Sequence, residues 1–125
     1  MPKLSSDSPE VQEYGPVTVR EQVMDGYTVN FVTFHENVDH RPLLKGLPDD
    51  RCPCPHWGYV LEGKVTFQFT DGGEEVYEVG DAFYAPAGHL PVHEPGTSYV
   101  QFSPSDELKK TSDKIMENMQ AMQGA

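Results

Sequence analysis

The chain has 125 residues, a length that predicts one domain built around a single hydrophobic core. Its formal net charge of −11 comes from 20 acidic and 9 basic residues, which argues against binding to nucleic acids or to anionic membranes. No segment has the length of an apolar membrane span, and the residues after Met1 are polar, without the core of a signal peptide. We therefore expect a cytoplasmic protein.

The N-terminal third of the chain predicts a flexible arm, a β-hairpin and an irregular loop. Residues 1 to about 13 carry Ser, Asp, Pro and Glu with little to bury, which is typical of a flexible arm. Apolar and polar residues alternate over 17–24 and again over 27–35, on either side of the strong turn pair Asp25-Gly26. Pro and Gly residues then interrupt 36–50, which predicts a loop.

The middle of the chain predicts a series of short strands separated by Gly and Pro residues. Such spacing, with a turn signal roughly every ten residues, is typical of an antiparallel sandwich or barrel. The sequence therefore predicts an all-β core. The expected strands lie at 59–61, which continues an extended strand from Arg51, and at 65–70, 75–79, 83–85, 89–93 and 98–102.

The C-terminal segment changes period and predicts one helix over about 104–122. Ser103, Pro104 and Asp106 have the order of an N-cap, a first helical proline and an acidic residue in the first turn. An apolar stripe follows at helical spacing, which predicts a helix laid on the barrel or across a partner. A methionine-lined binding groove is the alternative. The stripe consists of Leu108, Ile115, Met119 and Met122, with Ser112 in between.

The stretch from Arg51 to Gly63 contains both cysteines and the only tryptophan of the chain. Cys52, Cys54 and His56 are spaced two residues apart, so an extended backbone would turn all three side chains to one face. Two cysteines so close in sequence are a poor structural disulfide. The spacing favours a metal site, although a single cysteine in a β-barrel is more often a small buried side chain than a ligand.

Glycine and proline positions around this stretch resemble those of the cupin family. Gly80, Pro86 and Gly88 match the spacing of the second cupin motif, and Val60 to Gly63 reproduces the end of the first. The resemblance covers about residues 27–102. It implies a double-stranded β-helix, or jelly-roll barrel, which we expect over about 14–102 of a single cupin domain spanning 1–125.

The ligand positions of the first cupin motif are changed in this chain. Counted back from Gly63, His56 occupies the place of the family's glutamate, Cys52 that of its second histidine, and Asp50 that of its first. The closest match is a variant subgroup of small cupins with Cys and His in place of the usual His and Glu. A thiolate with imidazoles favours Zn²⁺, with Fe, Cu, Ni or Mn as alternatives.

The second motif is changed as well, because Pro91 stands at its histidine position. His89 and His93 flank Pro91 at two residues on either side, and this shared parity predicts that both face the barrel interior. Which cysteine and which of these two histidines bind metal stays open at this point. The predicted metal-ligand candidates are Cys52, Cys54, His56, His89 and His93.

These residues predict a small metal-binding cupin with a Cys/His site in the barrel that binds or acts on a small molecule. The alternatives are a metal-free cupin that binds a ligand or a partner without catalysis, and a thiol-based redox sensor. No catalytic base is assigned, and Asp50 and Glu94 are the only candidates for inward-facing carboxylates. His35 and His40 are expected to be surface or capping residues.

A homodimer is expected, because jelly rolls expose sheet faces and the C-terminal helix has an apolar stripe. Trp57 and Tyr59 have the opposite parity to His56, so they are expected on the outer face. That position suits a sheet or dimer contact. The sequence indicates neither the substrate nor the reaction.

Overall fold

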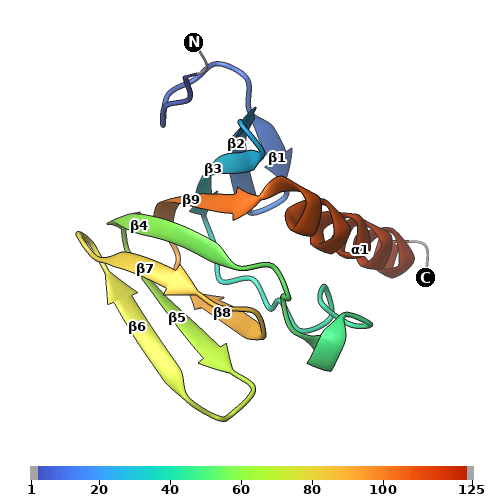
Figure 1. Ribbon diagram of the computed structural model, residues 1–125. Coiled ribbons are helices and arrows are strands. Elements are labelled where there is room, and N and C mark those ends of the chain that lie inside the picture. The colour runs from blue at the N-terminus through green and yellow to red at the C-terminus, as the bar shows by residue number, and fades with distance from the viewer. Residues whose placement is uncertain (1–2, 124–125) are drawn as a thin grey trace.

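The computed structural model describes residues 3–123 and consists of two antiparallel β-sheets and one C-terminal helix (Figure 1). The larger sheet has six strands in the order β1-β2-β3-β9-β4-β7, and its neighbours β3, β9 and β4 are far apart in sequence. This arrangement agrees with the predicted jelly roll. Its strands are β1 (Gln12–Tyr14), β2 (Val17–Met24), β3 (Tyr27–Phe34), β4 (His56–Glu62), β7 (Ala82–Ala85) and β9 (Thr97–Pro104).

The smaller sheet has three strands in the order β6-β5-β8. Strand β5 (Lys64–Phe69) lies in the centre, between β6 (Glu74–Glu78) and β8 (His89–His93). Residues Phe67 and Val65 of the central strand are buried at 1% and 0% exposure. They belong to the main hydrophobic core between the two sheets, together with Val32, Phe34, Val60, Phe83, Ala85 and Tyr99.

The hairpin turns are formed by the glycine and aspartate pairs that the sequence predicts. Asp25 and Gly26 have φ values of 52° and 82°, the left-handed conformation that a tight two-residue turn requires. Gly63 also has a positive φ of 76°, and a Cβ atom there would lie 2.6 Å from the Cα atom of Thr97. Both the conformation and the close approach of the backbones therefore require glycine at this position.

Strand β4 begins at His56, later than the extended stretch from Arg51 predicts. Pro53 and Pro55 have no N–H group, so this segment cannot pair continuously with a neighbouring strand. Only Cys52 makes a β-bridge, with His89 of β8. The prediction of one continuous strand carrying Cys52, Cys54 and His56 is therefore wrong, and the three side chains do not form a single row.

Helix α1 (Ser105–Gln123) covers one open end of the strands (Figure 1). It begins two residues after Ser103, because β9 continues through Pro104; the predicted N-cap role of Ser103 is therefore wrong. Asn118 of the helix donates hydrogen bonds to the carbonyl oxygens of Leu43 and Lys45, at 2.7 and 2.9 Å. These bonds tie the helix to the loop between β3 and β4.

This loop contains one short 3₁₀ helix, Pro48–Asp50, and carries the apolar residue Leu44, which is 2% exposed. Leu44 packs with residues of the cysteine stretch and of the helix in a second, smaller core. That core joins the loop, α1 and β8 into one wall beside the barrel. Its members are Leu44, Cys52, Cys54 and Leu90, with Leu47, Leu108 and Ile115 packed against them.

Candidate metal centre

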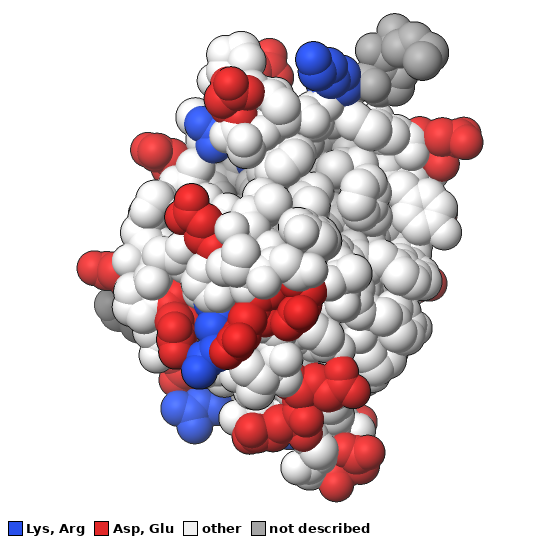
Figure 2. Space-filling view, turned by 90° about the vertical axis from the view of Figure 1, so that its left-hand side faces the viewer, with Lys and Arg blue, Asp and Glu red and all other residues white. Residues whose placement is uncertain are grey.

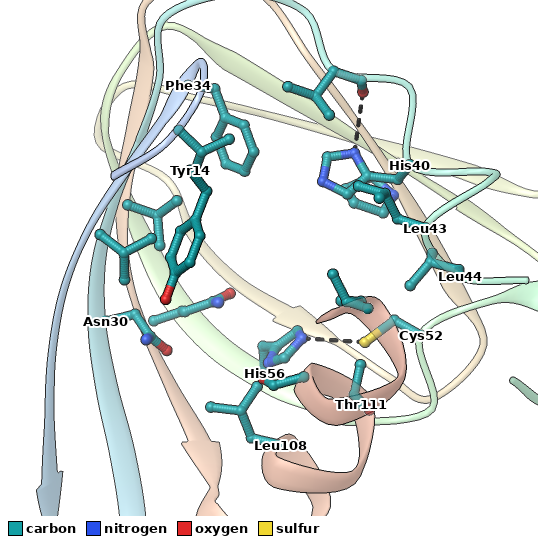
Figure 3. A pocket seen from close by; sticks show the side chains of 18 of the residues that line it. Tyr14, Asn30, Phe34, His40, Leu43, Leu44, Cys52, His56, Leu108 and Thr111 are labelled. Atoms are coloured by element: carbon teal, nitrogen blue, oxygen red, sulfur yellow. Dashed lines mark hydrogen bonds between the residues drawn. The ribbon is translucent and has the colours of Figure 1, made fainter. Parts of the chain in front are cut away.

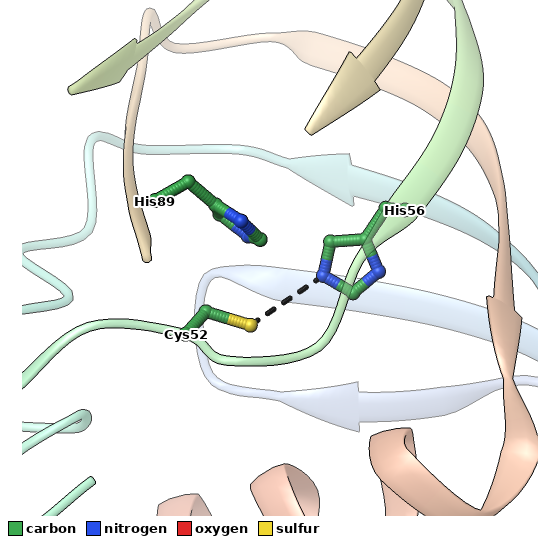
Figure 4. Close-up of side chains that lie close together, drawn as sticks. All are labelled: Cys52, His56 and His89. Carbon is green, nitrogen blue, oxygen red and sulfur yellow. Dashed lines mark hydrogen bonds between the residues drawn. The ribbon is translucent and has the colours of Figure 1, made fainter. Parts of the chain in front are cut away.

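Three of the predicted ligand residues, Cys52, His56 and His89, lie together in the barrel (Figure 4). One ligand atom of each lies within 4.8 Å of the other two, and all three residues are buried. We call them the thiol–imidazole cluster. The Sγ atom of Cys52 lies 3.5 Å from Nε2 of His56. Ligand atoms around a tetrahedral zinc ion are about 3.3–3.7 Å apart, so a small inward movement would complete such a set.

Backbone pairing brings these residues together from separate parts of the chain. Cys52 and His89 form an antiparallel bridge, in which the Cys52 N–H donates to the His89 carbonyl oxygen at 3.0 Å. His56 is the first residue of β4, whose pairing with β9 places Trp57 opposite Phe102. That register sets His56 beside Ser103, the next residue of β9.

Each histidine of the cluster has its Nδ1 atom next to an oxygen atom. His56 Nδ1 lies 2.6 Å from the Ser103 hydroxyl, and His89 Nδ1 donates to the Pro86 carbonyl oxygen at 2.8 Å. A proton held on Nδ1 leaves the lone pair of Nε2 free to bind a metal ion. Histidines that bind metal ions in proteins commonly have such an oxygen partner at the second ring nitrogen.

Burial keeps the cluster uncharged in the absence of metal. It lowers the pKa of His56 to about 3, with a further contribution from His89, and the pKa of His89 to about 4. Burial also raises the pKa of the Cys52 thiol to about 11. At neutral pH both imidazoles are therefore unprotonated and able to coordinate. The thiol needs a bound cation to lose its proton.

Cys54, the second cysteine, is fully buried but does not join the cluster. Its Sγ atom lies 3.5 Å from the Pro55 carbonyl oxygen, and its side chain packs in the second core beside Leu90. Burial raises the pKa of this thiol to about 12. The surroundings of Cys54 are those of a small apolar side chain.

His93 is buried, as its parity predicts, but it lies apart from the cluster. Its ring stacks on Phe34 with the ring centres 3.6 Å apart, and its Nε2 atom lies 3.0 Å from the Tyr99 hydroxyl. Its Nδ1 atom has no hydrogen-bond partner among the described residues. The ring therefore belongs to the aromatic packing of the barrel.

A cavity of about 520 Å³ opens beside the cluster, and Cys52, His56 and His89 line it. This volume is within the range of roughly 300–1,000 Å³ that is typical of small-molecule sites. Figure 3 shows Cys52 and His56 at the wall of the cavity, with Leu108 and Thr111 of α1 next to them. The apolar stripe of the helix thus lines the cavity, and does so through Leu108, Ile115, Met119 and Met122.

Several residues of this site were not assigned to it from the sequence. His40 was expected at the surface, but it lines the cavity and its Nδ1 donates to the Val38 carbonyl oxygen at 3.1 Å (Figure 3). Asn30 also lines the cavity and is only 5% exposed. The alternation in β3, which puts Asn30 on the same face as Val32 and Phe34, was the signal that could have identified it.

The two carboxylates considered as possible bases lie elsewhere. Asp50 accepts a hydrogen bond from the Gly46 N–H at 2.9 Å, and Glu94 lies 3.3 Å from the ammonium group of Lys64. Neither residue lines the cavity. His35, as expected, is exposed, and its ring contacts the Thr18 hydroxyl at 2.7 Å.

Comparisons with known proteins identify the fold. The family model described as "Cupin domain" matches residues 53–97, a range that begins one residue after Cys52. No sequence among the curated proteins compared with the chain is significantly similar to it. Among residues 3–123, no helix combines the length and the apolar character needed to cross a membrane.

Solved structures with the same architecture include three proteins at 18–20% identity. An RmlC-like cupin from Shewanella frigidimarina is 18% identical with a TM-score of 0.58. The match covers 81% of this chain and 88% of that protein's chain. KdgF from a Halomonas species is 20% identical with a TM-score of 0.51, covering 76% and 86%. A cupin-2 domain containing protein from Shewanella frigidimarina is 18% identical with a TM-score of 0.50, covering 69% and 78%. These three structures share the jelly-roll fold of this chain, and the match to the cupin domain lies within that fold.

Proposed function

We propose that the chain is a metal-binding cupin that holds a divalent ion, best fitted by zinc, through the thiol–imidazole cluster. The observation that carries this proposal is the convergence of one thiol and two imidazoles within 4.8 Å, with both Nδ1 atoms next to oxygen partners. One sulfur and two nitrogen ligands suit zinc, and three protein ligands leave a coordination position open. A bound zinc ion would supply Lewis-acid character at the cavity wall.

The residues of the chain provide orientation and a site shielded from water. Ser103 orients His56, and the Pro86 carbonyl oxygen fixes the tautomer of His89. Helix α1 and the loop before β4 cover the cavity, where a small molecule would bind next to the metal ion. We propose binding or conversion of a small molecule at this place, in a reducing compartment such as the cytoplasm, because both thiols are free.

The test compares the metal content of Cys52→Ala and Cys54→Ala protein. Elemental analysis of the unaltered protein should find about one zinc ion per chain. Cys52→Ala should lose most of this metal because a ligand is removed, whereas Cys54→Ala should keep it because Cys54 lies outside the thiol–imidazole cluster. Zinc-free unaltered protein that does not take up Zn²⁺, Fe²⁺, Cu²⁺, Ni²⁺ or Mn²⁺ would contradict the proposal.

A second candidate function is a metal-free cupin that binds a small ligand. The mainly apolar cavity of about 520 Å³ supports it, since such a cavity can hold a ligand without a metal ion. Ligand binding that does not change when the metal is removed would favour this alternative. A redox sensor has less support, because burial raises the pKa of both thiols and leaves them weak nucleophiles.

We also propose that the chain forms a homodimer through the outer face of the six-stranded sheet. Large side chains are exposed on that face, as the parity of Trp57 and Tyr59 predicts. Light scattering during size-exclusion chromatography should give twice the monomer mass, and Tyr59→Glu should shift it toward the monomer. A monomeric mass for the unaltered protein at micromolar concentration would contradict this prediction. The exposed side chains are Tyr27, Trp57, Tyr59, Tyr84 and Phe102.

A further inference from the structure

The charged side chains that line the cavity beside the cluster are all acidic. Among the described residues that line it, the charged side chains are the carboxylates of Glu21 and Asp39, and there is no Lys or Arg. The surface has the same bias: Asp and Glu side chains predominate over Lys and Arg on the face shown in Figure 2. The field in and around the cavity therefore opposes the entry of anions.

Only one of these two carboxylates is available to a ligand. Arg41 contacts Asp39 through two hydrogen bonds of 2.9 Å, which neutralise its charge. Glu21 forms no ion pair with a Lys or Arg within residues 3–123. Glu21 is exposed at the cavity, so its charge is open to a ligand from solvent.

A buried amide holds Glu21 in place. The Nδ2 atom of Asn30 donates to Oε1 of Glu21 at 2.7 Å, from the neighbouring strand that pairs these two residues directly. Asn30 is 5% exposed, so its amide has little freedom to move. One carboxylate oxygen is thus fixed by the protein, and Oε2 remains as an acceptor. A preorganised carboxylate of this kind binds a cation at lower entropic cost than a free side chain.

The space between Glu21 and the cluster is mainly apolar. Val17 and Val19 of β2 line it on one side, and Met116 and Met119 of α1 line it on another. Figure 3 shows Asn30 on one side of the cavity and Cys52 on the opposite side. A ligand that reaches from one to the other would contact the apolar walls along its length. Methionine side chains adapt readily to such ligands.

We propose that the cavity selects a small apolar amine, whose ammonium group binds Glu21 while its apolar body extends toward the thiol–imidazole cluster. This inference names the ligand class for the site of the proposed function and rests on that function for the role of the cluster. The amine recognition itself depends only on Glu21, Asn30 and the apolar walls. It therefore persists in metal-free protein.

Three probes of similar size and different charge test the inference: 2-phenylethylamine, 2-phenylethanol and 3-phenylpropanoate. Their dissociation constants are measured by NMR titration at neutral pH with metal-free and with zinc-loaded protein. In metal-free protein the amine should bind about fivefold tighter than the alcohol, as expected for an ion pair near solvent, and the anion should bind weakest.

Glu21→Gln should abolish the preference for the amine and leave the alcohol's affinity unchanged, because glutamine can still accept the hydrogen bond from Asn30. The matched control is Glu13→Gln, which makes the same change of net charge in β1, outside the cavity lining. Glu13→Gln should keep the preference, which shows that local charge, and not total charge, is responsible.

The outcomes separate this inference from the proposed function. Equal affinities for the three probes, a preference for the anion in metal-free protein, or no binding of any probe would overturn the amine inference. An equal effect of Glu13→Gln and Glu21→Gln would overturn it as well. A protein without metal affinity that still prefers the amine would overturn the proposed metal site and support the inference.

Discussion

His56→Ala is expected to lower the affinity for Zn²⁺ by more than about a hundredfold, since it removes a ligand from a set of only three. The affinity is measured by competition with a zinc-binding dye at neutral pH. His35→Ala is the matched control, because it removes an exposed histidine whose ring lies next to the Thr18 hydroxyl, outside the cluster. It should leave the affinity unchanged.

Ser103→Ala should have a smaller effect on the same measurement, about tenfold, because it removes only the oxygen that orients His56. The decisive result is therefore the order of the three variants in their affinity for Zn²⁺: His35→Ala highest, Ser103→Ala lower and His56→Ala lowest. If His56→Ala and His35→Ala bind zinc equally well, the cluster does not form the metal site. Urea unfolding of each variant shows whether a loss of affinity arises from loss of the fold.

The sequence predicted much of the fold because turn residues and alternation are local signals. Asp25-Gly26 requires a tight turn wherever it occurs between two alternating segments, and the structure has that turn. The parity of β4 likewise predicted an outward Trp57, which is 43% exposed. Such features depend on neighbouring residues, so a single sequence contains them.

The start of β4 and the start of α1 were mispredicted because tertiary contacts decide them. Pro53 and Pro55 break the pairing that residue spacing alone suggested, and Cys52 pairs with β8 instead. Ser103 has the local signature of an N-cap, but its hydroxyl is 2.6 Å from His56, in a strand that crosses from another part of the chain. A local motif gives no information on such a contact.

The choice among the five candidate ligands also depends on distant contacts. The sequence left open which cysteine and which second-motif histidine would meet His56. The bridge between Cys52 and His89 brings these two together, while Cys54 packs against the second core and His93 against Phe34. The assignment of Cys52, His56 and His89 as ligands remains a prediction until metal is measured.

The second large effect is a loss of stability on acidification of the metal-free protein. It is expected because burial lowers the pKa of four of the five histidines. Desolvation of the charged form is the largest cause in each, and a neighbouring histidine lowers the pKa further in all but His40. In the unfolded chain these histidines titrate near pH 6.5, whereas in the folded, metal-free protein they remain neutral to lower pH. The four are His40, His56, His89 and His93.

The unfolded state therefore binds more protons than the folded state as the pH falls below about 6.5, so the free energy of unfolding must fall with it. The loss is on the order of 1.4 kcal/mol per pH unit for each histidine until its folded pKa is reached. For His89 that limit is a pKa of about 4, and for His56 about 3. Carboxylates with lowered pKa values, such as Asp39, change the free energy of unfolding only at more acidic pH.

Urea unfolding of metal-free protein between pH 7 and pH 5 should show this fall as a steep shift of the midpoint to lower urea concentration. His89→Gln should make the shift shallower because glutamine does not titrate. A midpoint that stays constant from pH 7 to pH 5 would contradict the prediction.

Zinc should raise the midpoint most at pH 7, because protons compete with the metal for Cys52 and the imidazoles as the pH falls. The acid sensitivity and the proposed metal affinity therefore share two residues, the buried and uncharged His56 and His89.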